Sequence, residues 1–122
     1  MGMTPVLDAR RLAELGDDLG DAEFLEQTIG VYLSELPKRR AAMNEAHDVH
    51  DDDALRGVGH SLGSSSALFG AAEVEIACRA LELYPSGLDK AGVAELVARV
   101  NVACDRAQVA MQEWLAAQGS NR

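Results

Sequence analysis

The sequence predicts an all-α protein, an antiparallel up-down-up-down four-helix bundle with a short extra helix at its N-terminus. Three observations support this fold class. Alanine, leucine and glutamate are abundant while only three prolines occur, which favours helices. Apolar residues recur at helical spacing in four long segments. Short polar stretches separate these segments, and an antiparallel bundle is the simplest arrangement that buries four such faces.

The composition indicates a single domain spanning residues 1–122 and excludes several classes of partner. Hydrophobic residues make up 48% and charged residues 25% of the chain, a balance typical of a folded domain. The formal net charge of −9 argues against nucleic acid and against a membrane surface as partners. Apolar runs are too short to cross a bilayer, and the N-terminus carries no apolar signal core, so we expect a cytoplasmic protein.

The first two predicted helices occupy the N-terminal third of the chain. A short helix covers residues 8–15 and stops at Gly16, before a turn with the sequence GDDLGD. The second helix covers residues 22–47 and follows Asp21, a favourable N-cap residue. Its apolar pattern keeps its phase beyond Pro37, which predicts one kinked helix rather than two. The stripe that faces the core consists of Leu25, Ile29, Tyr32, Leu36 and Met43.

The apolar face of this second helix is wider than one core contact requires. Phe24, Thr28 and Val31 lie to one side of the stripe. They are either part of a broad core face or a patch on which a partner docks. We favour docking, with Phe24 and Val31 as the contact residues.

Residues 47–53, HDVHDDD, form a polar connection to the third helix. Asp51 and the two acids after it suit the positive N-terminal end of that helix. His47 and His50 could bind a metal together with nearby carboxylates. A solvated turn is the more frequent outcome for such a tract, so we predict no metal site.

Residues 55–70 read LRGVGHSLGSSSALFG, a composition that resembles a loop. Helical spacing is nevertheless kept through the stretch, at Leu55, Val58, Leu62, Ser65 and Phe69. The segment is therefore predicted to be the third helix, with His60 on the side away from this stripe. The helix neighbours of His60 are Arg56 and four small residues, Gly57, Gly63, Ser64 and Ala67. Of these, Gly57 and Ala67 are predicted to contact a docking partner, together with Phe24 and Val31.

The glycines of this helix need an explanation, because each costs roughly 1 kcal/mol relative to alanine in a helix interior. We expect Gly59, which turns toward the core, to permit close helix packing. Gly57 and Gly63 flank His60, and we interpret them as clearing space for the surface of another protein. An accessible neutral imidazole is a nucleophile that can carry a phosphoryl group on a ring nitrogen. The chain has no nucleotide-binding motif, so that phosphate would come from another protein.

Two further helices complete the predicted bundle, over residues 71–84 and 88–118, with a PSG turn between them. Cys78 and Cys104 fall on their apolar stripes, and we predict buried thiols rather than a disulfide. The other members of the stripes are Val74, Ala77 and Leu81 in the fourth helix, and Val93, Leu96, Val97, Val100, Ala103, Ala107, Met111 and Trp114 in the last.

The segment HSLGSSSALFGA resembles the signature of histidine-containing phosphotransfer (HPt) domains, approximately H-x-L-K-G-S-[SA]-x-x-[LF]-G-[AL]. His60 matches the phosphorylated histidine of that signature. The preceding segment, FLEQTIGVYLSELPKRRAAM, is similar to the second helix of the family, and the following segment, CRALE, is similar to the fourth. The resemblance covers about residues 8–116. Further matching positions are Leu62, Ser65, Ser66, Phe69, Gly70 and Ala71.

The resemblance implies a four-helix bundle that relays a phosphoryl group between aspartates of response-regulator receiver domains. It implies no cofactor of its own, because the receiver domain supplies Mg²⁺. Two positions depart from the signature: Gly63 replaces the usual lysine, and Ser64 replaces the usual glycine. The missing lysine removes a positive charge near the phosphoryl group, and Arg56 is the candidate to replace it. Ser64 either hydrogen-bonds a phosphoryl oxygen or only preserves access.

The leading hypothesis is a phosphorelay intermediate that works through His60, a phosphoryl carrier without its own ATP site rather than an enzyme. Its expected partners are receiver domains and a hybrid sensor histidine kinase, and we expect a monomer. The alternative is a docking module that binds a receiver or kinase without transfer, which the absent lysine favours and the retained His60 disfavours. A third interpretation, an independent enzyme or metal protein, rests only on His47 and His50.

Overall fold

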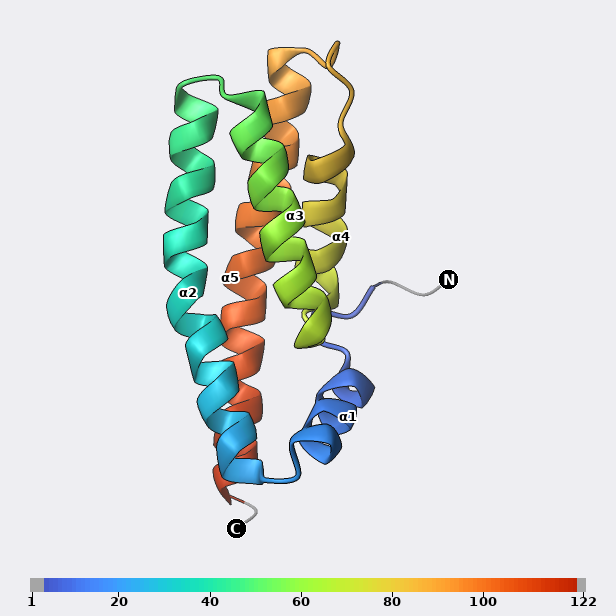
Figure 1. Ribbon diagram of the computed structural model, residues 1–122, viewed down its shortest axis with the longest axis vertical. Helices are drawn as coiled ribbons and strands as arrows, with labels where there is room; N and C mark the ends of the chain where they lie inside the picture. The colour runs from blue at the N-terminus through green and yellow to red at the C-terminus, as the bar shows by residue number, and fades with distance from the viewer. Residues whose placement is uncertain (1–3, 121–122) are drawn as a thin grey trace.

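The computed structural model describes residues 4–120, which form five α-helices (Figure 1). Four of them make a bundle in which α2 contacts α3 and α5, and α4 contacts α3 and α5. The short α1 packs against the beginning of α2, at one end of the bundle. The predicted four-helix bundle with an extra N-terminal helix is therefore confirmed. The helices are α1 (Ala9–Leu19), α2 (Ala22–Asp48), α3 (Asp52–Leu68), α4 (Ala72–Leu83) and α5 (Lys90–Ser120).

Two predicted helix boundaries are wrong, and the structure gives a reason for each. Helix α1 continues through Gly16, where a Cβ atom would lie 3.1 Å from a methyl group of Leu25, so this glycine lets α1 pack against α2. The helix ends instead at Gly20, whose φ of 70° is the left-handed conformation that terminates many helices. Helix α5 begins at Lys90 rather than residue 88, because the Asp89 carboxylate accepts a hydrogen bond from the Gly92 amide at 2.7 Å.

Helix α2 is one continuous helix, as its sequence pattern predicts. Its N-terminus is capped by Asp21, whose carboxylate accepts hydrogen bonds from the amides of Glu23 and Phe24. Pro37 lies inside the helix, and Figure 1 shows the axis of α2 bending in its lower half. The predicted stripe faces the core, since its five members are all buried: Leu25, Ile29, Tyr32, Leu36 and Met43.

Helix α3 is confirmed as a helix, but it buries a slightly different face from the predicted one. Val58 and Ser65 are only half-buried, whereas Gly59 is buried. At Gly59 a Cβ atom would lie 2.7 Å from the carbonyl oxygen of Cys78 and 2.8 Å from the amide of Glu82. The expected role of Gly59 in close packing is confirmed, and this contact turns α3 toward α4. The buried residues of α3 are Leu55, Gly59, Leu62, Gly63 and Ser66.

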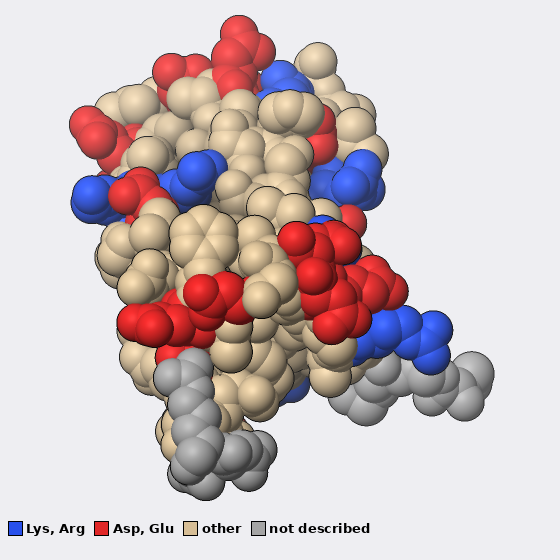
Figure 2. Space-filling model, turned by 60° about the horizontal axis from the view of Figure 1, so that its bottom comes forward, with Lys and Arg blue, Asp and Glu red and all other residues tan. Residues whose placement is uncertain are grey.

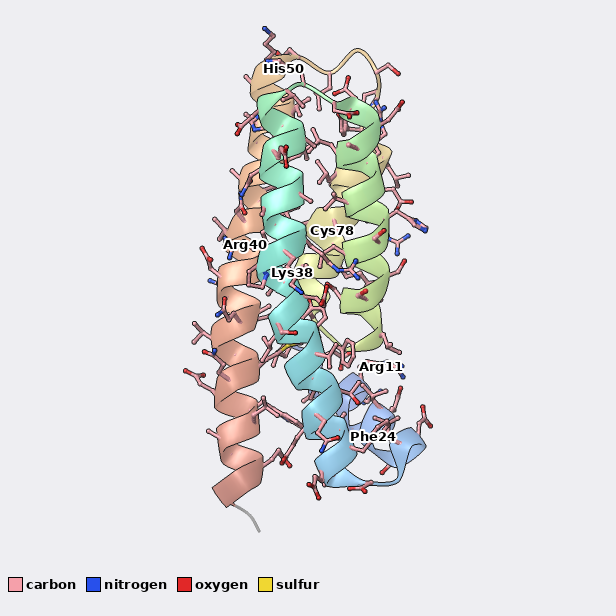
Figure 3. The ribbon with its side chains drawn as sticks, turned by 60° about the vertical axis from the view of Figure 1, so that its left-hand side comes forward. Arg11, Phe24, Lys38, Arg40, His50 and Cys78 are labelled. Carbon is pink, nitrogen blue, oxygen red and sulfur yellow. The ribbon has the colours of Figure 1, made fainter. Side chains whose placement is uncertain are left out.

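The core contains one hydrogen-bonded serine and two cysteines whose thiols are protonated. The buried Ser66 hydroxyl is hydrogen-bonded to the hydroxyl of Tyr32 at 2.6 Å, which ties α3 to α2. Both cysteines are free and fully buried, as predicted. Burial raises the pKa of the Cys78 thiol to about 12 and that of Cys104 to about 11, so both stay protonated at neutral pH. Figure 3 shows Cys78 inside the bundle.

The surface is rich in acidic groups, in keeping with the net charge of −9. Figure 2 shows them gathered in several clusters on one face, with uncharged surface between the clusters. Within residues 4–120, no helix combines the length and the apolar character that a bilayer span requires.

The α3–α4 contact makes Gly59 a sensitive position. We expect Gly59→Ala to lower the free energy of unfolding by about 1–3 kcal/mol, because the new methyl group meets backbone atoms of α4 rather than a flexible side chain. Urea unfolding followed by circular dichroism measures the change.

Gly57→Ala is the matched control, since no atom lies within 4 Å of a Cβ placed there. It should raise stability by about 0.5–1 kcal/mol through helix propensity alone. If Gly59→Ala were as stable as the wild type, the close approach of the two helices would be dispensable.

Candidate functional site

His60 lies in the middle of α3 and its side chain is 69% exposed. The predicted exposure of the imidazole is therefore confirmed. Gly57, one turn earlier, leaves open space beside it, because nothing lies within 4 Å of a Cβ placed there. Ser64, one turn later, is also exposed, and Ala67 is half-buried. A protein surface can therefore approach the ring along α3.

The imidazole has a carboxylate partner on the neighbouring helix. Nδ1 of His60 lies 2.8 Å from Oε2 of Glu82, whose side chain is 28% exposed on α4. Because a carboxylate only accepts hydrogen bonds, this geometry assigns the ring proton to Nδ1. The lone pair of Nε2 is then free. The pair thus holds the ring in the tautomer whose Nε2 carries the free lone pair.

Glu82 was not predicted from the sequence as a partner of His60. Only residues on the helix of His60 were considered as its neighbours. The signal that finds Glu82 is the register of α3 against α4, which the contact of Gly59 with Glu82 sets. Gly59, the residue before His60, therefore contacts the turn of α4 that carries the Glu82 carboxylate.

A small polar hollow of about 130 Å³ lies beside His60, between α3 and α4. Two of the predicted residues, Gly63 and Ser64, line this hollow. Its wall carries charges of both signs. The remaining lining residues are Gly59 from α3 and Glu75, Arg79 and Glu82 from α4.

The interpretation of Gly63 as an open flank of His60 is wrong. Gly63 is buried, and a Cβ atom there would lie 3.2 Å from the Cβ of Cys78. Its absent side chain makes room for α4 rather than for a partner.

Arg56, the predicted replacement for the lysine, is occupied elsewhere. Its guanidinium group lies over the ring of Tyr84, 4.4 Å from the centroid, and its Nε donates to the Tyr84 carbonyl oxygen at 3.3 Å. It also lies 3.6 Å from a carboxylate oxygen of Asp53. These contacts hold Arg56 against the C-terminal end of α4. Arg79, which sequence reasoning assigned no role, is the arginine that lines the hollow.

Phe24 and Val31, the predicted docking residues on α2, are surface residues rather than core residues. Phe24 is 50% exposed and Val31 is 61% exposed. Val31 precedes Tyr32, whose hydroxyl is hydrogen-bonded to Ser66 in the last turns of α3. Phe24 lies farther along, near α1 and at the opposite end of the bundle from His50 (Figure 3). The exposure excludes the broad-core interpretation for both residues, and their role in docking stays a prediction.

The described residues contain no group of three or more histidine, cysteine, aspartate or glutamate side chains arranged to hold a metal ion. His47 lies in the last turn of α2 and His50 in the turn that follows it.

Comparison with known proteins agrees with this architecture. A family model described as the Hpt domain matches residues 27–117, which include His60. None of the curated proteins compared with the chain matches it. Among solved structures, the chain resembles histidine-containing phosphotransfer protein B (HptB) from Pseudomonas aeruginosa PAO1, with a TM-score of 0.78 and 19% sequence identity over 93% of this chain and 97% of that chain. That likeness concerns the fold, while the family match spans most of the sequence. The chain therefore belongs to the Hpt domain family.

Proposed function

We propose that this protein relays a phosphoryl group between aspartates of response-regulator receiver domains through a phosphorylated His60. The observation that carries the proposal is an exposed imidazole whose Nδ1 is held by Glu82, leaving Nε2 free. Membership of the Hpt family supports it. On this proposal the protein is a phosphoryl carrier rather than a kinase.

In the transfer step, the lone pair of Nε2 attacks the phosphorus of an aspartyl phosphate on the receiver. A nitrogen–phosphorus bond forms, the bond between phosphorus and the aspartate oxygen breaks, and the aspartate leaves as a carboxylate. The proton on Nδ1 stays in its hydrogen bond to Glu82. The reverse sequence on a second receiver domain returns His60 to its starting state.

Glu82 contributes to this step through charge and orientation. The ring gains positive charge as the nitrogen–phosphorus bond forms, and a carboxylate 2.8 Å from Nδ1 stabilises that charge. The same hydrogen bond fixes the direction in which Nε2 points. Glu82 touches no phosphoryl oxygen in this scheme and is a positioning residue.

The partner completes the site. A receiver domain would supply the aspartate and a Mg²⁺ ion, whose charge offsets that of the transferring phosphoryl group. The apolar surface at Phe24 and Val31, together with the exposed Leu68 at the end of α3, offers it a contact area. A hybrid sensor histidine kinase is a further partner, because its receiver domain presents the same chemistry.

The alternative function is a docking module that binds a receiver domain without accepting phosphate. One observation favours it: position 63 lies in the α3–α4 contact, so the helix of His60 does not present a cation there.

The first test is phosphoryl transfer from a panel of phosphorylated receiver domains to the wild type and to His60→Gln. We expect acid-labile, base-stable label on the wild type alone, because a phosphoramidate has that stability and His60 is the proposed site of phosphorylation. Receivers that bind the wild type but never label it would support the docking module instead.

The Glu82 hydrogen bond predicts a slower Glu82→Gln variant. We expect its maximal transfer rate to fall by about tenfold, since the amide lacks the charge that stabilises the ring. Nitrogen chemical shifts of the imidazole should show a wild type that is mainly protonated on Nδ1, and a mixture of tautomers in Glu82→Gln.

Glu95→Gln on α5 serves as the control, because Glu95 is exposed and is paired with Arg99 rather than with His60. Unchanged tautomer populations in Glu82→Gln would contradict the positioning role.

The docking surface is tested with a matched pair of valines. Val31 is 61% exposed on α2, and Val102 is 58% exposed on α5, beside α4. We expect Val31→Asp to weaken receiver binding about tenfold by placing a desolvated charge in the interface, and Val102→Asp to leave it unchanged. Isothermal titration calorimetry with the best receiver measures both. Equal effects of the two variants would show that the interface lies elsewhere.

A further inference from the structure

In the hollow beside His60, the lining residues from α3 include no cation, and the structure offers one from α4. A transferring phosphoryl group spreads negative charge over its outer oxygens, and transfer sites normally place a positive group against them. The following inference rests on the proposed function, because it concerns the same phosphoryl group on His60.

Position 63 on α3 carries no cation in this chain, and it is crowded by α4. Gly63 packs against Cys78, with only 3.2 Å between the Cβ of Cys78 and the place where a Cβ of residue 63 would stand. One turn further toward the N-terminus of α3, the contact at Gly59 is tighter still, because backbone atoms of α4 lie at 2.7 and 2.8 Å. A side chain at position 59 would therefore meet the backbone of α4, and one at position 63 would require Cys78 to shift by a few tenths of an ångström.

Arg56 is also poorly placed for this role. It is held by the ring and the carbonyl group of Tyr84, and its ion pair with Asp53 points to the beginning of α3. To reach a phosphoryl group on His60, it would have to give up a cation–π contact and a hydrogen bond at the same time.

Arg79 is placed on the hollow itself. It lines this hollow together with His60 and Ser64, and it lies one turn of α4 before Glu82, the residue bonded to His60. Its side chain is 62% exposed, and its ion pair with Glu75 is long, at 3.6 Å. Exposed pairs of this kind contribute little, so the guanidinium can turn toward a stronger partner.

We propose that Arg79 binds the phosphoryl oxygens during transfer to and from His60, and that it replaces from α4 the lysine missing from α3. The planar guanidinium presents two N–H groups that match two oxygens of a phosphoryl group. Arg79 is then a catalytic residue that touches the reacting group, whereas Glu82 holds the imidazole ring through its hydrogen bond to Nδ1. The two residues with these two roles lie one turn apart on α4.

The test measures the rate of transfer from a phosphorylated receiver domain as a function of receiver concentration. We expect Arg79→Ala to lower the maximal rate about tenfold or more while the half-saturating concentration stays the same, because the lost contact forms only as phosphate moves. Arg79→Lys should recover part of the rate, since it restores the charge without the two-pronged geometry.

Arg99→Ala is the matched control. Arg99 is 60% exposed and pairs with Glu95 four residues earlier in its helix, just as Arg79 is paired with Glu75. It should transfer at the wild-type rate. Arg79→Gln, which keeps most of the side-chain stem, guards against a folding effect of the alanine variant, and circular dichroism checks the fold of each protein.

Several outcomes would overturn the proposal. An Arg79→Ala protein that transfers within twofold of the wild-type rate would show that the positive charge of Arg79 does not contribute to transfer. A variant changed only in its half-saturating concentration would make Arg79 a docking residue. A large loss in Arg56→Ala with none in Arg79→Ala would assign the cation to Arg56. Failure of the proposed function is distinguishable from all of these, because the wild type itself would then remain unlabelled.

Discussion

The close approach of α3 and α4 is the contact on which the rest of the site depends. At Gly59 the two helices meet backbone to backbone, with no side chain between them. That contact fixes the register in which α4 passes His60, and so brings the Glu82 carboxylate to Nδ1. It also sets the buried face of α3, which leaves the imidazole outside. Glycine is a poor helix former, yet only glycine fits here, so the cost in helix propensity is offset by a contact that no other residue permits.

The same contact separates two kinds of surface around His60. Toward α4, the surface is a small polar hollow with a carboxylate and a guanidinium on its wall. Toward α2, the surface is open and partly apolar, with Val31 and Leu68 exposed. The imidazole lies between these two surfaces. Glu82 holds it on the α4 side, and it is accessible on the α2 side. A nucleophile that must meet a large partner requires this combination of a fixed ring and an open approach.

Much of this arrangement follows from sequence periodicity, and the remainder depends on how two helices meet. The buried stripe of α2, the exposure of His60 and the burial of Cys78 are all readable from helical spacing. The role of Gly63 is not, because its own helix cannot show that Cys78 of another helix fills the space beside it. The roles of Glu82 and Arg79 could not be predicted either, because both residues lie on a different helix from His60. Helix ends were misjudged where a single glycine, Gly16, was read as a stop although the left-handed turn comes at Gly20.

The division between the α2 side and the α4 side has a consequence for how such a protein diverges. Residues that a partner would touch lie on α2 and the end of α3, whereas residues that hold the imidazole lie on α4. On the proposed function, substitutions on α2 would therefore change which regulator is recognised without disturbing the imidazole of His60. Substitutions on α4 can tune the chemistry without altering recognition. A duplicated copy of the gene could acquire a new signalling partner in a few steps, because the two properties are encoded on separate helices.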